Sequence, residues 1–177
     1  MLNRAMSIGV EIERKFLVSI PVKEQLEQLN IVSEKHIVQT YLHRGKSGTQ
    51  RRVRSIREND QEKYYYTEKQ FISPIKRIEE EYEISRTEYE NRLRDADGEL
   101  VPVIKTRYCF EYSGQLFELD IYPYSDEYAV LELELSDPKQ EIFFPENINV
   151  IKDISADKAY SNAALAKAGR FPEQQDS

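Results

Sequence analysis

The feature that most constrains the fold is an alternation of polar and apolar residues that recurs in eight segments. In the first, GVEIERKFLV, apolar residues alternate with Glu11, Glu13 and Lys15. Side chains of a β-strand point to opposite faces with a period of two, so each segment predicts a strand with one charged and one apolar face. The predicted strands are residues 8–18, 36–43, 50–57, 63–70, 78–85, 101–112, 115–122 and 129–135.

Three helices fit between or after these strands. Pro21 suits the start of a helix over 21–29. The sequence TEYE at 87–90 has the pattern of a capping box, and Ser155 can cap a third helix over 156–168. Many antiparallel strands with few helices favour a barrel or a sandwich over other α+β folds.

The bulk properties limit the class of protein. A length of 177 residues suits one domain, which we place at 8–169 with loose termini at 1–7 and 170–177. A net charge of −7 argues against electrostatic binding to nucleic acid. The single Cys109 cannot form an internal disulfide, and no apolar run approaches the length of a membrane helix. We therefore expect a cytoplasmic protein with no membrane or nucleic-acid partner.

The charged rows repeat like charges two residues apart. Glu-x-Glu occurs at 11/13, 81/83 and 132/134, Arg-x-Arg at 52/54 and Lys-x-Arg at 105/107. Such neighbours lie about 7 Å apart and repel by roughly 2 kcal/mol at an effective dielectric constant of about 20. On an ordinary antiparallel sheet these rows would simply be the solvated face. If the rows are enclosed, groups of opposite charge must offset the repulsion.

Closing the eight strands into a barrel would turn the charged rows inward and the apolar rows outward, where helices could cover them. The charged rows would then line a water-filled tunnel. Basic groups in that tunnel suit phosphate oxygens, and arginine binds them with a two-pronged donor fork. Clustered carboxylates without Cys or His favour Mg²⁺ or Mn²⁺.

In their order along the chain, the charged motifs resemble the CYTH family, also called triphosphate tunnel metalloenzymes. The motifs are EIERK in the first strand, Arg-x-Arg, a later strand lysine, Lys-x-Arg, an acidic strand and a terminal Glu-x-Glu. The tail DISADKAYSNAALA is similar to the closing helix of bacterial members, so the resemblance runs from about Ile8 to Ala168. It implies a closed eight-stranded antiparallel tunnel that binds a triphosphate with Mg²⁺ or Mn²⁺.

The resemblance also implies roles for individual residues. The implied metal ligands are Glu11, Glu13, Glu81, Glu83, Asp120, Glu132 and Glu134. The implied triphosphate ligands are Lys15, Arg52, Arg54, Lys69, Lys105, Arg107 and Lys158. Tyr41 resembles a tunnel tyrosine of the bacterial tripolyphosphatases, and with Lys15 and Lys105 it is a candidate catalytic group.

Hydrolysis of inorganic tripolyphosphate is the activity that this resemblance favours. The alternatives are an adenylate cyclase of the class IV type, a thiamine triphosphatase, and a non-catalytic module that binds polyphosphate or nucleotides. We identify no adenine pocket in the sequence. The expected partner is a small-molecule triphosphate, and the family resemblance also implies a homodimer.

Overall fold

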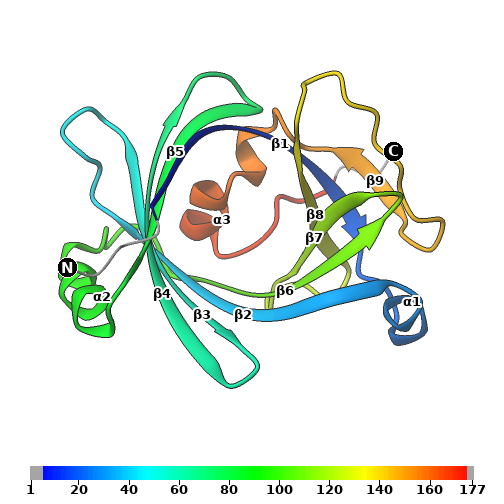
Figure 1. The fold of residues 1–177 in the computed structure, drawn as a ribbon, viewed down its shortest axis with the longest axis horizontal. Coiled ribbons are helices and arrows are strands. Elements are labelled where there is room, and N and C mark those ends of the chain that lie inside the picture. Colours follow the sequence, from blue (N-terminus) through cyan, green and yellow to red (C-terminus); the bar gives the residue numbers. More distant parts are fainter. Residues whose placement is uncertain (1–5, 175–177) are drawn as a thin grey trace.

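The computed structural model describes residues 6–174, and within them the chain is mainly β (Figure 1). Nine strands are present in this part of the chain. They are β1 (Met6–Ser19), β2 (Asn30–Leu42), β3 (Gln50–Glu58), β4 (Gln61–Phe71), β5 (Lys76–Ile84), β6 (Val103–Tyr112), β7 (Gln115–Ile121), β8 (Tyr128–Leu135) and β9 (Val150–Asp153).

The first eight strands close into an antiparallel barrel. The strand order is β5-β4-β3-β2-β6-β7-β8-β1, and β5 also pairs with β1, which joins the two ends of the sheet. The alternating segments therefore predicted both the strands and their closure, and the predicted eight-stranded barrel is confirmed. The short β9 was not predicted; it pairs with the end of β1 around Phe16–Val18, and four residues are too few to show an alternation.

Tight turns set the register of two hairpins. Ser113 and Gly114 both have positive φ, 50° and 72°, and join β6 to β7 in a two-residue turn. Asn59 and Asp60, with φ of 48° and 62°, do the same between β3 and β4. Both turns match the twist of the strands they connect.

Helices are short and lie at the positions that the sequence predicted, with corrected starts. They are α1 (Lys23–Glu27), α2 (Arg86–Arg92), η1 (Leu93–Asp95), η2 (Lys158–Tyr160) and α3 (Asn162–Ala168), where η marks a 3₁₀ helix. Ser85, two residues before the predicted cap, accepts a hydrogen bond from the backbone N–H of Glu88 and begins α2.

The predicted start of the last helix at Ser155 is wrong. Ser161 caps α3 by accepting from the backbone N–H of Ala164, and Gly169 ends the helix with a φ of 65°. The hydroxyl of Ser155 instead accepts from the backbone N–H of Lys15 and bonds the carboxylate of Asp153. Ser155 therefore ties the chain after β9 to β1.

Apolar rows on the outside of the barrel are covered from two sides. Phe16, Phe117 and Leu131 pack against Ile148 and other apolar residues of the segment that follows β8. On the opposite side, α2 covers the outer faces of β3 and β4, where Val53 and Tyr66 form a separate cluster. These contacts match the expectation that the apolar rows face outward.

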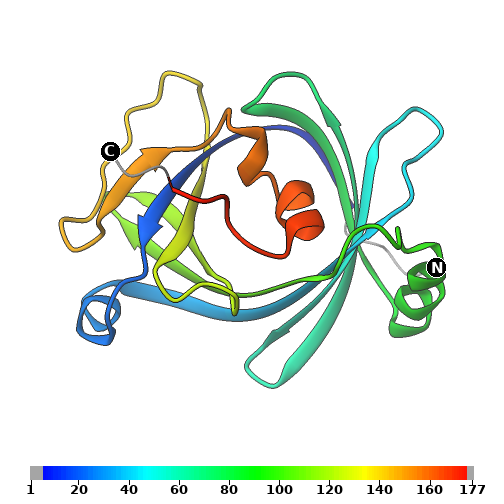
Figure 2. The same cartoon turned by 180° about the vertical axis from the view of Figure 1, so that it is seen from behind.

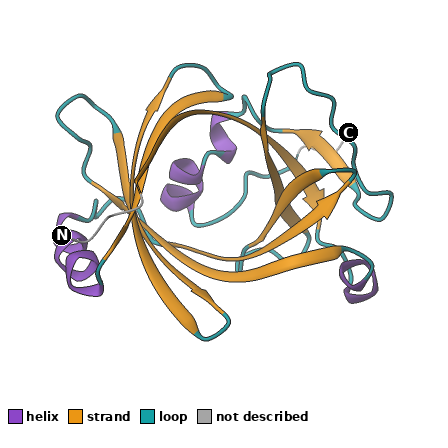
Figure 3. Ribbon diagram, in the orientation of Figure 1, coloured by secondary structure: helices purple, strands orange, loops and turns teal. Residues whose placement is uncertain are grey.

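One end of the barrel is apolar inside as well, which the sequence did not predict. There Leu17, Val103, Tyr122 and Val130 continue the charged rows of their strands but pack with Tyr160, Leu165, Ala166 and further apolar residues. Figures 1 and 2 show α3 within the ring of strands. In Figure 3, α1 and α2 lie outside this ring. The last helix thus fills one end of the barrel.

The chain after Gly169 continues against the same end of the barrel. Phe171 is 9% exposed and makes edge contacts with Tyr122 and Tyr124. Of the termini expected to be loose, residues 1–5 and 175–177 lie outside the described part. Residues 6–7 belong to β1, and Phe171 packs on the barrel. No helix among the described residues is long and apolar enough to cross a membrane.

Candidate active site

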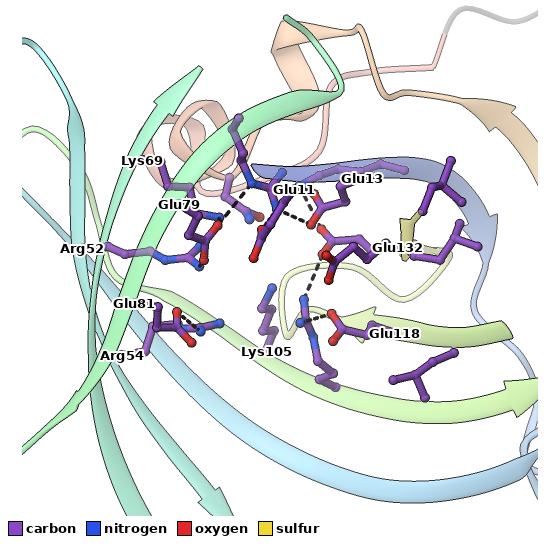
Figure 4. A pocket seen from close by; sticks show the side chains of 18 of the residues that line it. Glu11, Glu13, Arg52, Arg54, Lys69, Glu79, Glu81, Lys105, Glu118 and Glu132 are labelled. Carbon is purple, nitrogen blue, oxygen red and sulfur yellow. Dashed lines mark hydrogen bonds and ion pairs between the residues drawn. The ribbon is translucent and has the colours of Figure 1, made fainter. Parts of the chain in front are cut away.

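A charged cavity of about 510 Å³ lies inside the barrel (Figure 4). Its lining includes seven cationic and seven carboxylate side chains, together with a few leucines, Ser136 and Asn162. The cations are Lys15, Arg52, Arg54, Lys69, Arg77, Lys105 and Arg107; the carboxylates are Glu11, Glu13, Glu79, Glu81, Glu118, Glu132 and Glu134. Asn162 reaches the cavity from α3, so the helix that fills the barrel end also forms the floor.

The strand order separates most of these charges into two walls. The basic wall is formed by β4, β3 and β6 and consists of Arg52, Arg54, Lys69, Lys105 and Arg107. The acidic wall is formed by β7, β8 and β1 and consists of Glu11, Glu13, Glu118, Glu132 and Glu134. Figure 4 shows the arginines of β3 across the cavity from the carboxylates of β7 and β8.

Register places like charges directly opposite each other in the acidic wall. Glu13 is the cross-strand partner of Glu134, and Glu118 is the partner of Glu132. Like charges in such pairs are destabilising. Glu134 is exposed and makes no ion pair with any other described residue, so this carboxylate remains available at the cavity rim.

Lys15 is the cation of the acidic wall. Its Nζ lies 3.2 Å from Glu13 Oε1 and 2.9 Å from Glu132 Oε1. Burial alone would lower the pKa of Lys15, but the two carboxylates outweigh it and raise the pKa above the usual value. The ammonium group is therefore a permanent charge between the two carboxylates.

Asp120 lies behind the basic wall, beneath the cavity surface. It is completely buried, contacts Lys105 Nζ, and accepts two bonds from Arg107, at 2.7 Å from Nε and 2.8 Å from Nη2. Burial would raise the pKa of Asp120, but Arg107 and Lys105 bring it down to about 2. In this arrangement Asp120 aims two cations at the cavity, whereas the sequence resemblance implied a metal ligand.

Tyr41 also lies behind the basic wall. Arg52 Nη1 donates to Gln39 Oε1 at 3.0 Å, and Gln39 Nε2 donates to the Tyr41 hydroxyl at 3.0 Å. Tyr41 is 3% exposed within the apolar end of the barrel, and burial raises the pKa of its hydroxyl. The tyrosine faces inward, as predicted, but reaches the cavity only through Gln39 and Arg52.

Two residues that sequence reasoning missed, Arg77 and Glu79, lie in the cavity lining. Arg77 Nη2 lies 2.6 Å from Glu13 and 3.1 Å from Glu11, and Glu79 lies 2.6 Å from Lys69. Both residues continue the inward row of Glu81. Their spacing of two residues from Glu81 could have identified them. In the run RIEEEYE, however, Glu80 places a charge on the opposite face, so the alternation is not evident.

Two predicted ligands lie outside the cavity lining. Glu83 is exposed near the end of β5, and its nearest ion-pair partner is Lys63, at 3.7 Å. Lys158 is exposed on η2, while Tyr160 of the same turn packs into the apolar end of the barrel. Every other predicted ligand except the underlying Asp120 lines the cavity.

The donor chemistry of the acidic wall fits a hard divalent cation. The donors are carboxylates alone, which suit Mg²⁺ or Mn²⁺ better than softer metals. Burial and the adjacent Glu79 carboxylate raise the pKa of Glu11 to about 7, so negative charge here is insufficiently compensated. Cationic side chains already contact these carboxylates, and within residues 6–174 no three Asp, Glu, His or Cys side chains form a ready-made metal site.

Comparisons with known proteins agree with this geometry. A model of the CYTH domain matches residues 9–146. The crystal structure of the inorganic triphosphatase NE1496 is 29% identical, covers 89% of this chain and 94% of that chain, and has a TM-score of 0.54. The PH1819 protein from Pyrococcus horikoshii OT3 is 20% identical, covers 72% and 80%, and has a TM-score of 0.57, which supports the fold. No match was found among curated proteins.

The matched region contains most of β1 and all of β2 to β8, which are the strands of the closed barrel. It therefore includes both walls of the cavity and excludes only α3 from the elements that line it. The chain belongs to the CYTH family, whose members are divalent-metal-dependent enzymes that process triphosphates.

Proposed function

We propose that this protein hydrolyses inorganic tripolyphosphate to diphosphate and orthophosphate with Mg²⁺ or Mn²⁺. The observation that carries the proposal is the cavity in which a basic wall faces a carboxylate wall. The basic wall suits a chain of phosphates, and the acidic wall suits the cations that accompany it.

The charge balance of the cavity supports a metal-bound substrate. The seven cations of the lining are already matched by seven carboxylates, and Asp120 beneath Lys105 and Arg107 adds an eighth. A triphosphate brings several negative charges into this cavity, which holds no spare positive charge, and buried charges are costly unless compensated. Divalent cations entering with the substrate would supply that compensation.

The basic wall is positioned before substrate arrives. Asp120 holds Lys105 and Arg107, and Gln39 holds Arg52. Donors fixed in this way stabilise charge on a transferring phosphoryl group without having to reorganise during the reaction. Lys105 would act directly on the phosphates, and Tyr41 would act as a positioning residue through Gln39.

The acidic wall would hold the metal through Glu11, Glu13, Glu132 and Glu134. When bound, a divalent cation supplies Lewis-acid polarisation of phosphate oxygens and a bound water of lowered pKa. Lys15 lies between Glu13 and Glu132, where its ammonium group can neutralise negative charge on the phosphate that is being transferred.

The lining favours an inorganic chain over a nucleotide or thiamine triphosphate. None of the described side chains that line the cavity is aromatic, so the cavity offers no stacking surface for a base or a thiamine ring. The similar structure of 29% identity is named an inorganic triphosphatase, which supports the same substrate.

A product assay tests the proposal. Purified protein is incubated with tripolyphosphate, ATP or thiamine triphosphate, each with Mg²⁺ or Mn²⁺, and orthophosphate, diphosphate and cyclic AMP are measured. We expect the highest kcat/KM for tripolyphosphate, with equal amounts of diphosphate and orthophosphate. Cyclic AMP from ATP would favour a cyclase, and tight binding of tripolyphosphate without turnover would favour a binding module; either result would overturn the proposal.

A further inference from the structure

We propose that Arg77 is an internal counter-ion that occupies Glu11 and Glu13 in the metal-free protein and competes with the divalent cation for them. The inference rests on the proposed metal-binding role of these two carboxylates. It assigns to Arg77 a function different from that of the arginines in the basic wall.

The contacts of Arg77 are all with carboxylates. Its Nη2 lies 2.6 Å from Glu13 Oε2 and 3.1 Å from Glu11 Oε2, and its Nε lies 3.2 Å from Glu79 Oε2. The side chain is 10% exposed, so these pairs are largely shielded from water. One guanidinium group thus contacts both carboxylates of the first Glu-x-Glu motif.

The place of Arg77 in the barrel also sets it apart. It lies on β5 opposite Glu11 of β1, at the seam that closes the barrel. Arg54 offers the matched comparison: it lies in the basic wall and pairs at 2.6 Å with Glu81, away from the Glu-x-Glu motif of β1. Removing either arginine deletes one charge from the cavity, but only Arg77 covers Glu11 and Glu13.

A purely structural role is the competing explanation. Arg77 could serve only to clamp β5 to β1, although the backbone ladder from Met6–Ile12 to Lys76–Tyr82 already joins these strands. A clamp would affect stability and leave cation affinity unchanged. A counter-ion affects both, because without it the carboxylates of Glu11, Glu13 and Glu79 repel one another until a cation binds.

Metal binding without any phosphate compound tests the inference. Mn²⁺ is titrated into the wild type and into Arg77→Gln, Arg54→Gln and Arg86→Gln, and free Mn²⁺ is followed by electron paramagnetic resonance. Arg86 is an exposed helix residue paired with Glu90 and controls for net charge. We expect Arg77→Gln to bind Mn²⁺ at least tenfold more tightly than the wild type. Arg54→Gln should change affinity less than threefold, and Arg86→Gln should not change it.

Equal effects of Arg77→Gln and Arg54→Gln would overturn the inference, because they would reflect only the general charge of the cavity. Weaker binding by Arg77→Gln would overturn it too, since the arginine would then organise the carboxylates for the metal. If Arg77→Gln does not fold without Mn²⁺, Arg77→Lys serves instead, and its affinity should rise above the wild-type value because lysine lacks the forked donors with which the guanidinium holds Glu11, Glu13 and Glu79 together. An unchanged affinity in this lysine variant would then reject the counter-ion role.

These measurements contain no triphosphate, so they are independent of the reaction. A protein that binds Mn²⁺ as expected but does not cleave tripolyphosphate would contradict the proposed function alone. A protein that cleaves tripolyphosphate with unchanged Mn²⁺ affinity in Arg77→Gln would contradict this inference alone.

Discussion

At the scale of single residues, the carboxylates of the acidic wall should affect activity directly, because they are the proposed metal ligands. Glu11→Gln removes a charge from the proposed metal site while keeping the size of the side chain. We expect kcat/KM for tripolyphosphate at saturating Mg²⁺ to fall on the order of 100-fold or more, because ligand substitutions weaken metal binding and misplace the bound ion. The melting temperature should change little, and Glu80→Gln on the neighbouring strand is the matched control. Near-normal turnover by Glu11→Gln would contradict the metal assignment.

Asp120 should matter for stability as well as activity. Asp120→Asn leaves the buried Lys105 and Arg107 with less opposing charge, and breaking a buried ion pair costs about 3–5 kcal/mol. Urea unfolding monitored by circular dichroism should therefore show a loss of about 3 kcal/mol. Glu134→Gln, at the exposed rim, should stay within about 0.5 kcal/mol of the wild type. Equal stabilities of the two variants would argue against the role of Asp120 beneath the basic wall.

At this scale, the sequence predicted which side chains point into the barrel wherever charged and apolar residues alternate strictly. The rows of β1, β3, β6 and β8 each read as one charged face, and their predicted residues do line the cavity. Arg77 and Glu79 were missed because charges occupy both faces of β5. The positions of Asp120 and Tyr41 behind Lys105 and Arg52 depend on cross-strand register, which no single strand reveals.

At the scale of elements, α3 links the apolar end of the barrel to the cavity floor. Leu165 is 2% exposed and packs among inward residues of β1, β6 and β8 and Tyr122, which follows β7. We expect Leu165→Ala to lower the free energy of unfolding in urea by about 2–5 kcal/mol, because the surrounding side chains can only partly fill the space that the leucine leaves. Ile104→Ala, on the exposed outer face of β6, should cost less than about 1 kcal/mol. A small effect of Leu165→Ala would mean that α3 is only loosely seated.

The strands were predictable because a period of two survives tertiary packing. The place of α3 was not, since an apolar helix face is equally compatible with the outside and the inside of a barrel. Only the closed ring shows that the inward rows turn apolar at Leu17, Val103, Tyr122 and Val130. The start of α3 was misplaced for a local reason: both Ser155 and Ser161 are suitable caps, but Ser155 bonds Lys15 of β1 and Asp153 of β9 instead.

At the scale of the whole molecule, a bound cation should stabilise the barrel. Carboxylates repel across the β1–β8 and β7–β8 strand pairs. A cation that binds them only in the folded state therefore shifts the unfolding equilibrium towards the folded protein. After treatment with EDTA, adding Mn²⁺ at about 100 times its Kd should stabilise the protein by about 2.7 kcal/mol. Differential scanning calorimetry should record this as a rise in melting temperature, with Ca²⁺-free NaCl of equal ionic strength as control. An identical rise with NaCl would indicate simple screening.

Because α3 and the apolar residues around it fill one end of the barrel, substrate cannot pass through that end. A linear polymer cannot thread through such a chamber, so under the proposed function a longer polyphosphate could present only its end and would be released after each cut. Diphosphate would have to leave by the route through which the next substrate arrives. Because substrate entry and product release would share one opening, short chains would be favoured and diphosphate would compete with the substrate for the cavity.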